Sequence, residues 1–128
     1  MGRIIASVAI ENVVDKDKSL RCDALVDTGA SHMVLPMAWK ARLGDFETTH
    51  SVKIETATQD VFDAEIFGPV RIQIEGFRAI YSEVAFVEMQ PKNGDYEPLI
   101  GYLVLEQTPA ALDIIGHRLV PVRYFDLK

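Results

Sequence analysis

Short stretches in which apolar and polar residues alternate run along most of the chain, and they are rich in β-branched side chains. Such stretches, separated by polar turn residues, are typical of β-strands. Two hairpins are expected in the first half of the chain. Residues 3–14 would pair with 20–26 around the charged segment 15–18, and residues 51–57 would pair with 61–67 in a more polar and more exposed hairpin.

Two short segments carry the boundary residues of helices instead. Residues 37–43 follow Pro36 and precede Gly44. Proline suits the first turn of a helix and glycine the position just past its end, so a short helix is expected there. A second helix of one or two turns is expected at residues 102–107, before Pro109 ends it.

The remaining segments return to the alternating pattern of strands. Gly68 and Pro69 are expected to turn the chain into the next strand, and Glu75 and Gly76 to turn it again. Gly116 stands in the turn of a final hairpin. The later strands are expected at residues 70–74, 84–89, 111–115 and 119–124, with a loop at 90–97.

Many short strands with only two helical segments predict an all-β domain, built as a closed or partly closed barrel. Strands and helices do not alternate regularly, so a parallel doubly wound sheet is not expected. The 128 residues fit one domain that spans residues 1–128.

Composition excludes several classes of partner. The formal net charge is −6, and the basic residues form no stripe, so nucleic acid is not expected as a partner. Cys22 is the single cysteine, so no intrachain disulfide can form, and it is interpreted as a packed thiol. We find neither a signal peptide nor an apolar run of membrane-spanning length, and we expect a cytoplasmic protein that binds no membrane.

The segment with the clearest chemistry is Ala-Leu-Val-Asp-Thr-Gly-Ala-Ser-His, residues 24–32. Asp27 stands at the end of an apolar strand, where burying a charge is costly unless the charge is compensated. One interpretation is an ordinary turn, in which the Asp27 side chain accepts a hydrogen bond from its own backbone and Gly29 takes a positive φ. The other interpretation is a catalytic carboxylate.

Three features together resemble the retropepsin-like aspartic proteases. Residues 26–30, Val-Asp-Thr-Gly-Ala, followed by Val-Leu-Pro at 34–36, resemble the active-site loop of that family. Residues 98–101, Pro-Leu-Ile-Gly, resemble the apolar pair and glycine that support the loop. The hairpin at 51–67 falls where the family has its flap. The resemblance implies a retropepsin-like acid protease barrel with one or two short helices, similar to stand-alone cellular or prokaryotic relatives.

An aspartic protease needs two carboxylates that share one proton around one water molecule. This chain has a single Asp-Thr-Gly, because Asp23, Asp60, Asp63 and Asp113 lack the Thr/Ser-Gly that would mark a second copy. The second carboxylate must therefore come from another copy of the chain, and the resemblance implies one half of a two-fold homodimer.

The resemblance assigns roles to the residues of the loop. Asp27 would act as general base in one subunit and general acid in the other. Thr28 would hydrogen-bond across the dyad, and Gly29 would let the substrate backbone approach. Ala30 has no hydroxyl that could stabilise the ionised dyad, so we expect a pH optimum closer to neutral than that of a gastric-type enzyme.

Other residues would contact an extended peptide substrate. Ser31 and His32 replace an acidic pair that binds substrate backbone in retroviral relatives. Leu25, Val34 and Leu99 would line apolar pockets, although each is equally well explained as core. The expected flap tip is unusual because it contains no glycine; its residues are Ala57, Thr58, Gln59 and Asp60.

The function and the dimer edge both remain open at this point. The chain could be a non-catalytic peptide-binding or dimerisation module that keeps the protease fold. The dimer edge could be built from the two termini, residues 1–5 and 119–128, as in viral relatives. No metal or other cofactor is expected, because His32, His50 and His117 have no metal-ligand spacing.

Overall fold

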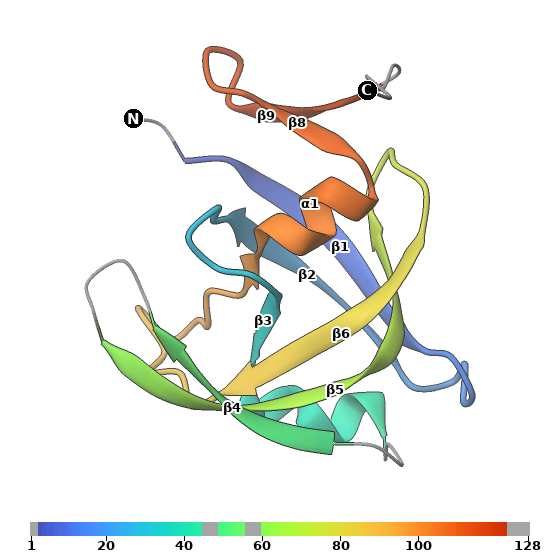
Figure 1. Ribbon diagram of the computed structural model, residues 1–128, viewed down its shortest axis with the longest axis vertical. Helices are drawn as coiled ribbons and strands as arrows, with labels where there is room; N and C mark the ends of the chain where they lie inside the picture. Colours follow the sequence, from blue (N-terminus) through green and yellow to red (C-terminus); the bar gives the residue numbers. More distant parts are fainter. Residues whose placement is uncertain (1–2, 45–48, 56–59, 123–128) are drawn as a thin grey trace.

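Strands account for most of the elements in the computed structural model, which describes residues 3–44, 49–55 and 60–122 (Figure 1). The two short helices are a 3-10 helix and one α-helix. In chain order the elements are β1 (Ile5–Asn12), β2 (Ser19–Val26), β3 (Met33–Pro36), η1 (Met37–Leu43), β4 (Thr49–Glu55), β5 (Val61–Ile74), β6 (Ile80–Val87), β7 (Leu99–Ile100), α1 (Tyr102–Gln107), β8 (Ala110–Asp113) and β9 (Arg118–Pro121).

Seven strands form one sheet in the order β1-β2-β7-β3-β6-β5-β4. Strand β1 also pairs with β5, so the sheet closes on itself and β4 is added outside the ring. Closure leaves the ring strands without free edges, which is one way in which antiparallel sheets avoid aggregation. The all-β barrel expected from the sequence is confirmed.

The barrel interior is filled by the alternate side chains of these strands. Val8 and Ile10 of β1 lie opposite Ile74 and Ile72 of β5, and all four are almost fully buried. Burial of each such side chain stabilises the fold by about 1.5–3 kcal/mol. The period-two pattern of residues 3–14 and 70–74 therefore places these side chains in the core, as alternation predicts.

The chain does not turn at Gly68 and Pro69, so that expectation was wrong. Strand β5 runs without interruption from Val61 to Ile74, and its pairing with β6 shifts register between Phe67 and Val70. Gly68 has a φ of 155°, and a Cβ there would lie 2.9 Å from Glu83 Cα. A glycine and a proline at a bulge bend a strand without ending it.

Both helices lie where the sequence predicts them. Residues 37–43 form a 3-10 helix, and Gly44 follows it with a φ of 82°. The end of α1 is fastened to the barrel by Arg78, whose Nε donates to Thr108 O at 2.7 Å and whose Nη2 donates to Gln107 O at 2.7 Å. These hydrogen bonds use helix carbonyls that have no partner within the helix.

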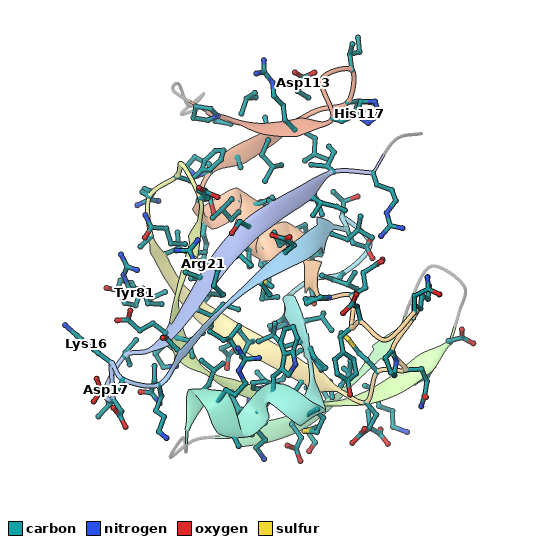
Figure 2. All side chains as sticks on the ribbon, turned by 180° about the vertical axis from the view of Figure 1, so that it is seen from behind. Lys16, Asp17, Arg21, Tyr81, Asp113 and His117 are labelled. Carbon is teal, nitrogen blue, oxygen red and sulfur yellow. The ribbon has the colours of Figure 1, made fainter. Side chains whose placement is uncertain are left out.

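The final hairpin forms a separate two-stranded sheet (Figure 1). Strand β8 ends at Asp113, so Ile114 and Ile115 belong to the turn and not to a strand that reaches residue 115. Strand β9 covers residues 118–121; residue 122 lies outside it, and residues 123–124 lie outside the described residues. Asp113 and His117 lie at the end of the hairpin that points away from the barrel (Figure 2).

Candidate active site

The loop that contains Asp27 begins where β2 ends and is fixed by its own hydrogen bonds. Asp27 Oδ1 accepts a hydrogen bond from Gly29 N at 2.9 Å, and Asp27 O accepts one from Ala30 N at 3.1 Å. The backbone turns because a short acidic side chain can accept from an amide two residues later. The turn geometry and the catalytic interpretation are therefore compatible, because the second carboxylate oxygen is not used in this hydrogen bond.

Strand β7 crosses between the two ends of this loop. Leu99 lies opposite Leu25 of β2 in parallel pairing and opposite Val34 of β3 in antiparallel pairing. Leu25 N donates to Pro98 O at 2.9 Å, and Asp27 N donates to Ile100 O at 3.0 Å. Two residues of one strand thus hold both the strand that enters the loop and the strand that leaves it.

Gly101 allows the closest backbone approach in the loop region. A Cβ at Gly101 would lie 2.5 Å from Ser31 C and 2.6 Å from Ser31 O, and it would also overlap His32 O. The following residues use this proximity, because Tyr102 N donates to Ala30 O at 2.9 Å and Leu103 N donates to Ser31 O at 3.0 Å. The first turn of α1 therefore holds the loop through donors that a helix start leaves free.

The loop presents polar groups at its tip and apolar groups at its base. Asp27 is half-buried, Thr28 and Gly29 are exposed, and Ala30 is buried. The Thr28 hydroxyl has no hydrogen bond within the described part of the protomer. An exposed Asp-Thr-Gly tip above a fixed base is accessible to another molecule.

An apolar cluster separate from the main core lies next to Ala30. Val34 is buried in this cluster, and Leu99 is half-buried at its margin. The remaining members come from the flap-side strands and the end of β6; they are Ala64, Ile66, Ala85 and Val87, with Val52 and Met89 packed against them. Val34 therefore belongs to this cluster and Leu99 packs against it, and the pocket-lining role expected for both stays a prediction.

The two residues after Ala30 contact each other. Ser31 Oγ and His32 Nδ1 are 2.8 Å apart, and both residues are half-buried. This hydrogen bond, together with the Leu103 contact to Ser31 O, fixes the segment that the sequence analysis assigns to substrate backbone. The Ser31 assignment itself stays a prediction.

The hairpin expected to form the flap lies partly within the described residues. Strands β4 and β5 pair antiparallel from Thr49 opposite Phe67 to Glu55 opposite Val61, as a flap hairpin requires. Asp60 is exposed at the start of β5. Ala57, Thr58 and Gln59 lie outside the described residues.

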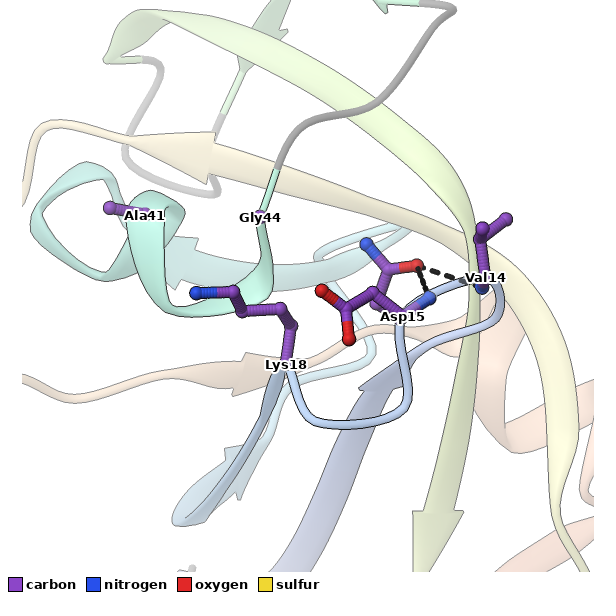
Figure 3. A pocket seen from close by; sticks show the side chains of 6 residues that line it. Val14, Asp15, Lys18, Ala41 and Gly44 are labelled. Carbon is purple, nitrogen blue, oxygen red and sulfur yellow. Dashed lines mark hydrogen bonds between the residues drawn. The ribbon is translucent and has the colours of Figure 1, made fainter.

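A pocket of about 400 Å³ lies elsewhere, beside the end of η1 (Figure 3). Its most buried polar residue is Asn12, whose Nδ2 donates to Leu43 O at 2.7 Å and whose Oδ1 accepts from Val14 N and Asp15 N. The side-chain amide nitrogen and oxygen of Asn12 thus both have partners, and these hydrogen bonds join the β1–β2 turn to η1. We assign this residue a structural role.

The described residues contain no cluster of three or more His, Cys, Asp or Glu side chains that could hold a metal ion. Among the same residues, no helix is long and apolar enough to span a membrane. Cys22 packs against the barrel core, as expected. This burial raises the pKa of its thiol to about 11, and Asp23 adds to the shift.

Comparison with known proteins gives the class of this chain. The family described as "Aspartyl protease" matches residues 8–103, from β1 to the first turn of α1. The chain therefore belongs to the aspartyl protease family. The match includes the Asp27 loop, β7 and Gly101, and it ends before the β8–β9 hairpin.

The fold also matches that of a retroviral protease. The structure of EIAV protease complexed with the inhibitor HBY-793 superposes with a TM-score of 0.62 at 22% sequence identity. The superposition covers 88% of this chain and 94% of the EIAV chain. A comparison with curated protein sequences gives no significant match. The retropepsin-like barrel expected from the motifs is confirmed.

Sequence reasoning missed some of the residues that hold the site. Tyr102 and Leu103 were noted only as the start of a helix, although their amides bind the loop. Ile4 was assigned to a strand, but its carbonyl accepts a hydrogen bond from Val26 N at 2.8 Å, just before Asp27. These residues hold the loop through backbone hydrogen bonds, which any residue type except proline can donate, so the residue types do not reveal them.

Proposed function

We propose that two copies of this chain form an aspartic endopeptidase, in which Asp27 of each copy supplies half of a catalytic dyad. The observation that carries the proposal is the Asp27 loop, which is held by β7 and α1 from behind while its Asp-Thr-Gly tip stays accessible. Membership in the aspartyl protease family supports the reaction class.

The chemistry follows from two carboxylates that share one proton. The ionised Asp27 accepts a proton from a water molecule, which attacks the carbonyl carbon of the scissile peptide bond. The protonated Asp27 of the other copy donates a hydrogen bond to the carbonyl oxygen and stabilises the negative charge that develops there. When the intermediate collapses, the leaving amine takes a proton and the shared-proton dyad is restored.

Neighbouring residues position the dyad and the substrate. The exposed Thr28 hydroxyl is available for a hydrogen bond to the other copy. An extended peptide lies between the β4–β5 hairpin and the loop, with Ser31 near its backbone. Leu99, which is half-buried, offers apolar surface to its side chains.

The test is a cleavage assay on a mixed peptide library, with and without pepstatin. We expect Asp27→Asn to lower the cleavage rate by at least about a thousandfold, because an amide cannot act as base. The matched control is Asp23→Asn, which removes an exposed carboxylate from the same strand and should leave the rate unchanged.

Cleavage that persists in Asp27→Asn would contradict the proposal. The competing function is a non-catalytic peptide-binding or dimerisation module with the protease fold. Peptide binding by the native chain without any cleavage would favour that module. The intact Asp-Thr-Gly favours the enzyme, because paired carboxylates give a binding module no evident advantage.

A further inference from the structure

Helix α1 is too short to define its own geometry. It contains 6 residues, Tyr102–Gln107, and neither end has a side-chain cap. Its first turn has no acidic residue and its last turn has no basic residue, so its own side chains do not balance the helix dipole. Isolated helices shorter than about 12–15 residues are marginal in water, so the geometry of α1 depends on contacts with other elements.

Arg78 supplies such a contact at the C-terminal end of α1. Its Nε donates to Thr108 O at 2.7 Å, and its Nη2 donates to Gln107 O at 2.7 Å. Hydrogen bonds from a charged donor are shorter and stronger than those between neutral groups. The planar guanidinium holds both carbonyl oxygens at once, and its positive charge lies at the negative end of the helix.

The backbone that carries Arg78 is itself held in the turn between β5 and β6. Phe77 N donates to Ile74 O at 2.9 Å, and Phe77 O accepts a hydrogen bond from Gln73 Nε2 at 2.8 Å. The Phe77 side chain packs against the main core. The Arg78 guanidinium therefore extends to α1 from a fixed point on the barrel.

The opposite end of α1 holds the active-site loop. Tyr102 N donates to Ala30 O at 2.9 Å. Leu103 N donates to Ser31 O at 3.0 Å, and the amide of Ala30 donates to Asp27 O at 3.1 Å. In Figure 1, α1 runs from the loop after β2 to the turn between β5 and β6. At about 1.5 Å per residue the helix spans about 9 Å, so hydrogen bonds at both ends act on one short body.

Core packing alone leaves the orientation of α1 less defined. Val104 and Leu105 are buried in the main core and hold one side of the helix against the barrel. Apolar burial is non-directional, whereas a hydrogen bond constrains both distance and angle. The rotation and the axial position of α1 therefore depend on the hydrogen bonds at its two ends. At the C-terminal end Arg78 makes two of these, and a bond from Gln107 Nε2 to Tyr81 O is longer, at 3.3 Å.

We propose that Arg78 is a positioning residue for catalysis, which keeps α1 in the orientation that places the Asp27 loop. This inference rests on the proposed function, in which two Asp27 carboxylates must lie close enough to share one proton. A displacement of about 1 Å, even one caused far from the reacting atoms, can lower a rate by about a hundredfold. Arg78 acts on the loop through α1 and not through the substrate.

The test compares three variants. Arg78→Met removes the charge and the donors, and it opens no cavity because Arg78 is exposed. Arg78→Lys keeps a charge and donors on a flexible stem. The matched control is Arg21→Met, because Arg21 is also exposed but donates to β1, from its Nη1 to Ser7 Oγ at 3.3 Å. Sedimentation and thermal unfolding give the amount of folded dimer, and each rate is expressed per mole of that dimer.

We expect Arg78→Met to lower kcat by about tenfold to a hundredfold and to change KM by less than about threefold, because loop placement changes and substrate contacts do not. Arg78→Lys should recover part of this loss, and Arg21→Met should keep the native kcat. The pH–rate profile of Arg78→Met should also be narrower, because carboxylates that are held less closely titrate with a smaller separation. A loss of folded protein alone lowers the profile without narrowing it.

Hydrogen exchange tests the hold on the loop without any need for activity. The amides of Tyr102 and Leu103 are protected by their hydrogen bonds to the loop carbonyls. We expect both amides to exchange at least about tenfold faster in Arg78→Met than in the native chain, and equally fast in Arg21→Met and the native chain.

Several outcomes would overturn the assignment of Arg78. These are an equal kcat in Arg78→Met and Arg21→Met, an effect on KM alone, or exchange of the two amides that Arg78→Met leaves unchanged. The two proposals also fail differently. If the native chain cleaves peptide and Arg78→Met cleaves it equally well, the Arg78 assignment fails and the protease stands. If the native chain cleaves nothing while Arg78→Met speeds the exchange, the hold of Arg78 on the loop stands and the protease fails.

Discussion

The active-site loop and the β8–β9 turn use the same local device with different surroundings. In each, an aspartate oxygen accepts a hydrogen bond from a glycine amide: Asp27 from Gly29 and Asp113 from Gly116, both at 2.9 Å. The Asp27 loop is also bound by β7 and by the start of α1. The Asp113 turn has Arg118 as its further side-chain partner and carries exposed isoleucines.

This difference shows that similar turns can have different surroundings within one short chain. The loop is defined by contacts with β7 and α1 in addition to its own hydrogen bonds. The turn is defined only locally, and its apolar residues have no cover within the described protomer. Only the first region is held from several sides, as a site for chemistry requires.

Two glycine substitutions test this contrast most strongly. In Gly101→Ala the new Cβ would overlap the Ser31 and His32 backbone, which cannot move without breaking the loop. We expect it to destabilise the protein by about 3 kcal/mol or more and to abolish cleavage. In Gly116→Ala the nearest atoms are the ends of the Asp113 and Arg118 side chains, which can rotate away. We expect a loss of about 1 kcal/mol or less.

Chemical denaturation and the peptide assay measure both effects. Equal destabilisation by the two substitutions would remove the distinction between the regions. A fully active Gly101→Ala would show that the Asp27 loop still functions when the backbone of Ser31 and His32 is displaced.

The extent of prediction from sequence also differs between the two regions. The position of the Asp27 loop at the end of β2 followed from the sequence, because a carboxylate after an apolar strand and before Thr-Gly is a local signal. Its catalytic role stays a prediction. The position of β7 between β2 and β3 could not be read from its two residues, because such pairing depends on distant parts of the chain. The positions of β1, β2 and α1 followed from alternation and turn residues, although β1 is two residues shorter at each end than the predicted strand 3–14.

The hairpin was predicted with an error that has a physical cause. Residues 111–115 are apolar except for Asp113, which is compatible with a strand, but the strand ends at Asp113. Apolar periodicity does not distinguish a strand residue from an apolar residue of the following turn. Similarly, Gly68 and Pro69 are typical of turns, yet they form a bulge inside β5.

The response of cleavage to pH sharpens the account of the loop. Ala30 is buried directly after the Asp-Thr-Gly, and it offers no hydroxyl to the dyad. We expect Ala30→Ser to move the optimum of the pH–rate profile downward by about one pH unit or less. A native optimum below about pH 4 would contradict the expected near-neutral activity.

The response of stability to pH sharpens the account of the hairpin. Hydrogen bonds from Gly116 and Arg118 hold the pKa of Asp113 below its ordinary value of 3.8. A lowered pKa in the folded turn means that its stabilisation is fully present above the ordinary value and is lost as the pH falls below that value, through the lower pKa of the folded turn. We therefore expect the native protein to lose more stability between about pH 4 and about pH 2 than Asp113→Ala does.

Chemical denaturation at each pH measures this effect, which is modest because Asp113 is exposed. The Asp113→Ala protein should be less stable at neutral pH and change less on acidification. An identical acid response in both proteins would show that the hydrogen bonds of Asp113 do not stabilise the turn.

Thiol labelling gives the smallest effect and compares the two regions directly. Burial raises the pKa of Cys22 to about 11, so its thiolate is scarce at neutral pH. We expect Cys22 to react with maleimide at least about tenfold more slowly than in the unfolded chain. A thiol introduced by Ile115→Cys, at a residue that is 92% exposed, should react almost as fast as in the unfolded chain.

The central claim is that each active site uses Asp27 from two copies of the chain. It is tested most directly by adding Asp27→Asn protein to a fixed amount of native protein and allowing subunits to exchange. If heterodimers are inactive, an equal amount should lower cleavage to about one half and a ninefold excess to about one tenth, as random pairing requires. Cleavage that stays constant at every ratio, while heterodimers form, would show that one Asp27 suffices and would contradict the account.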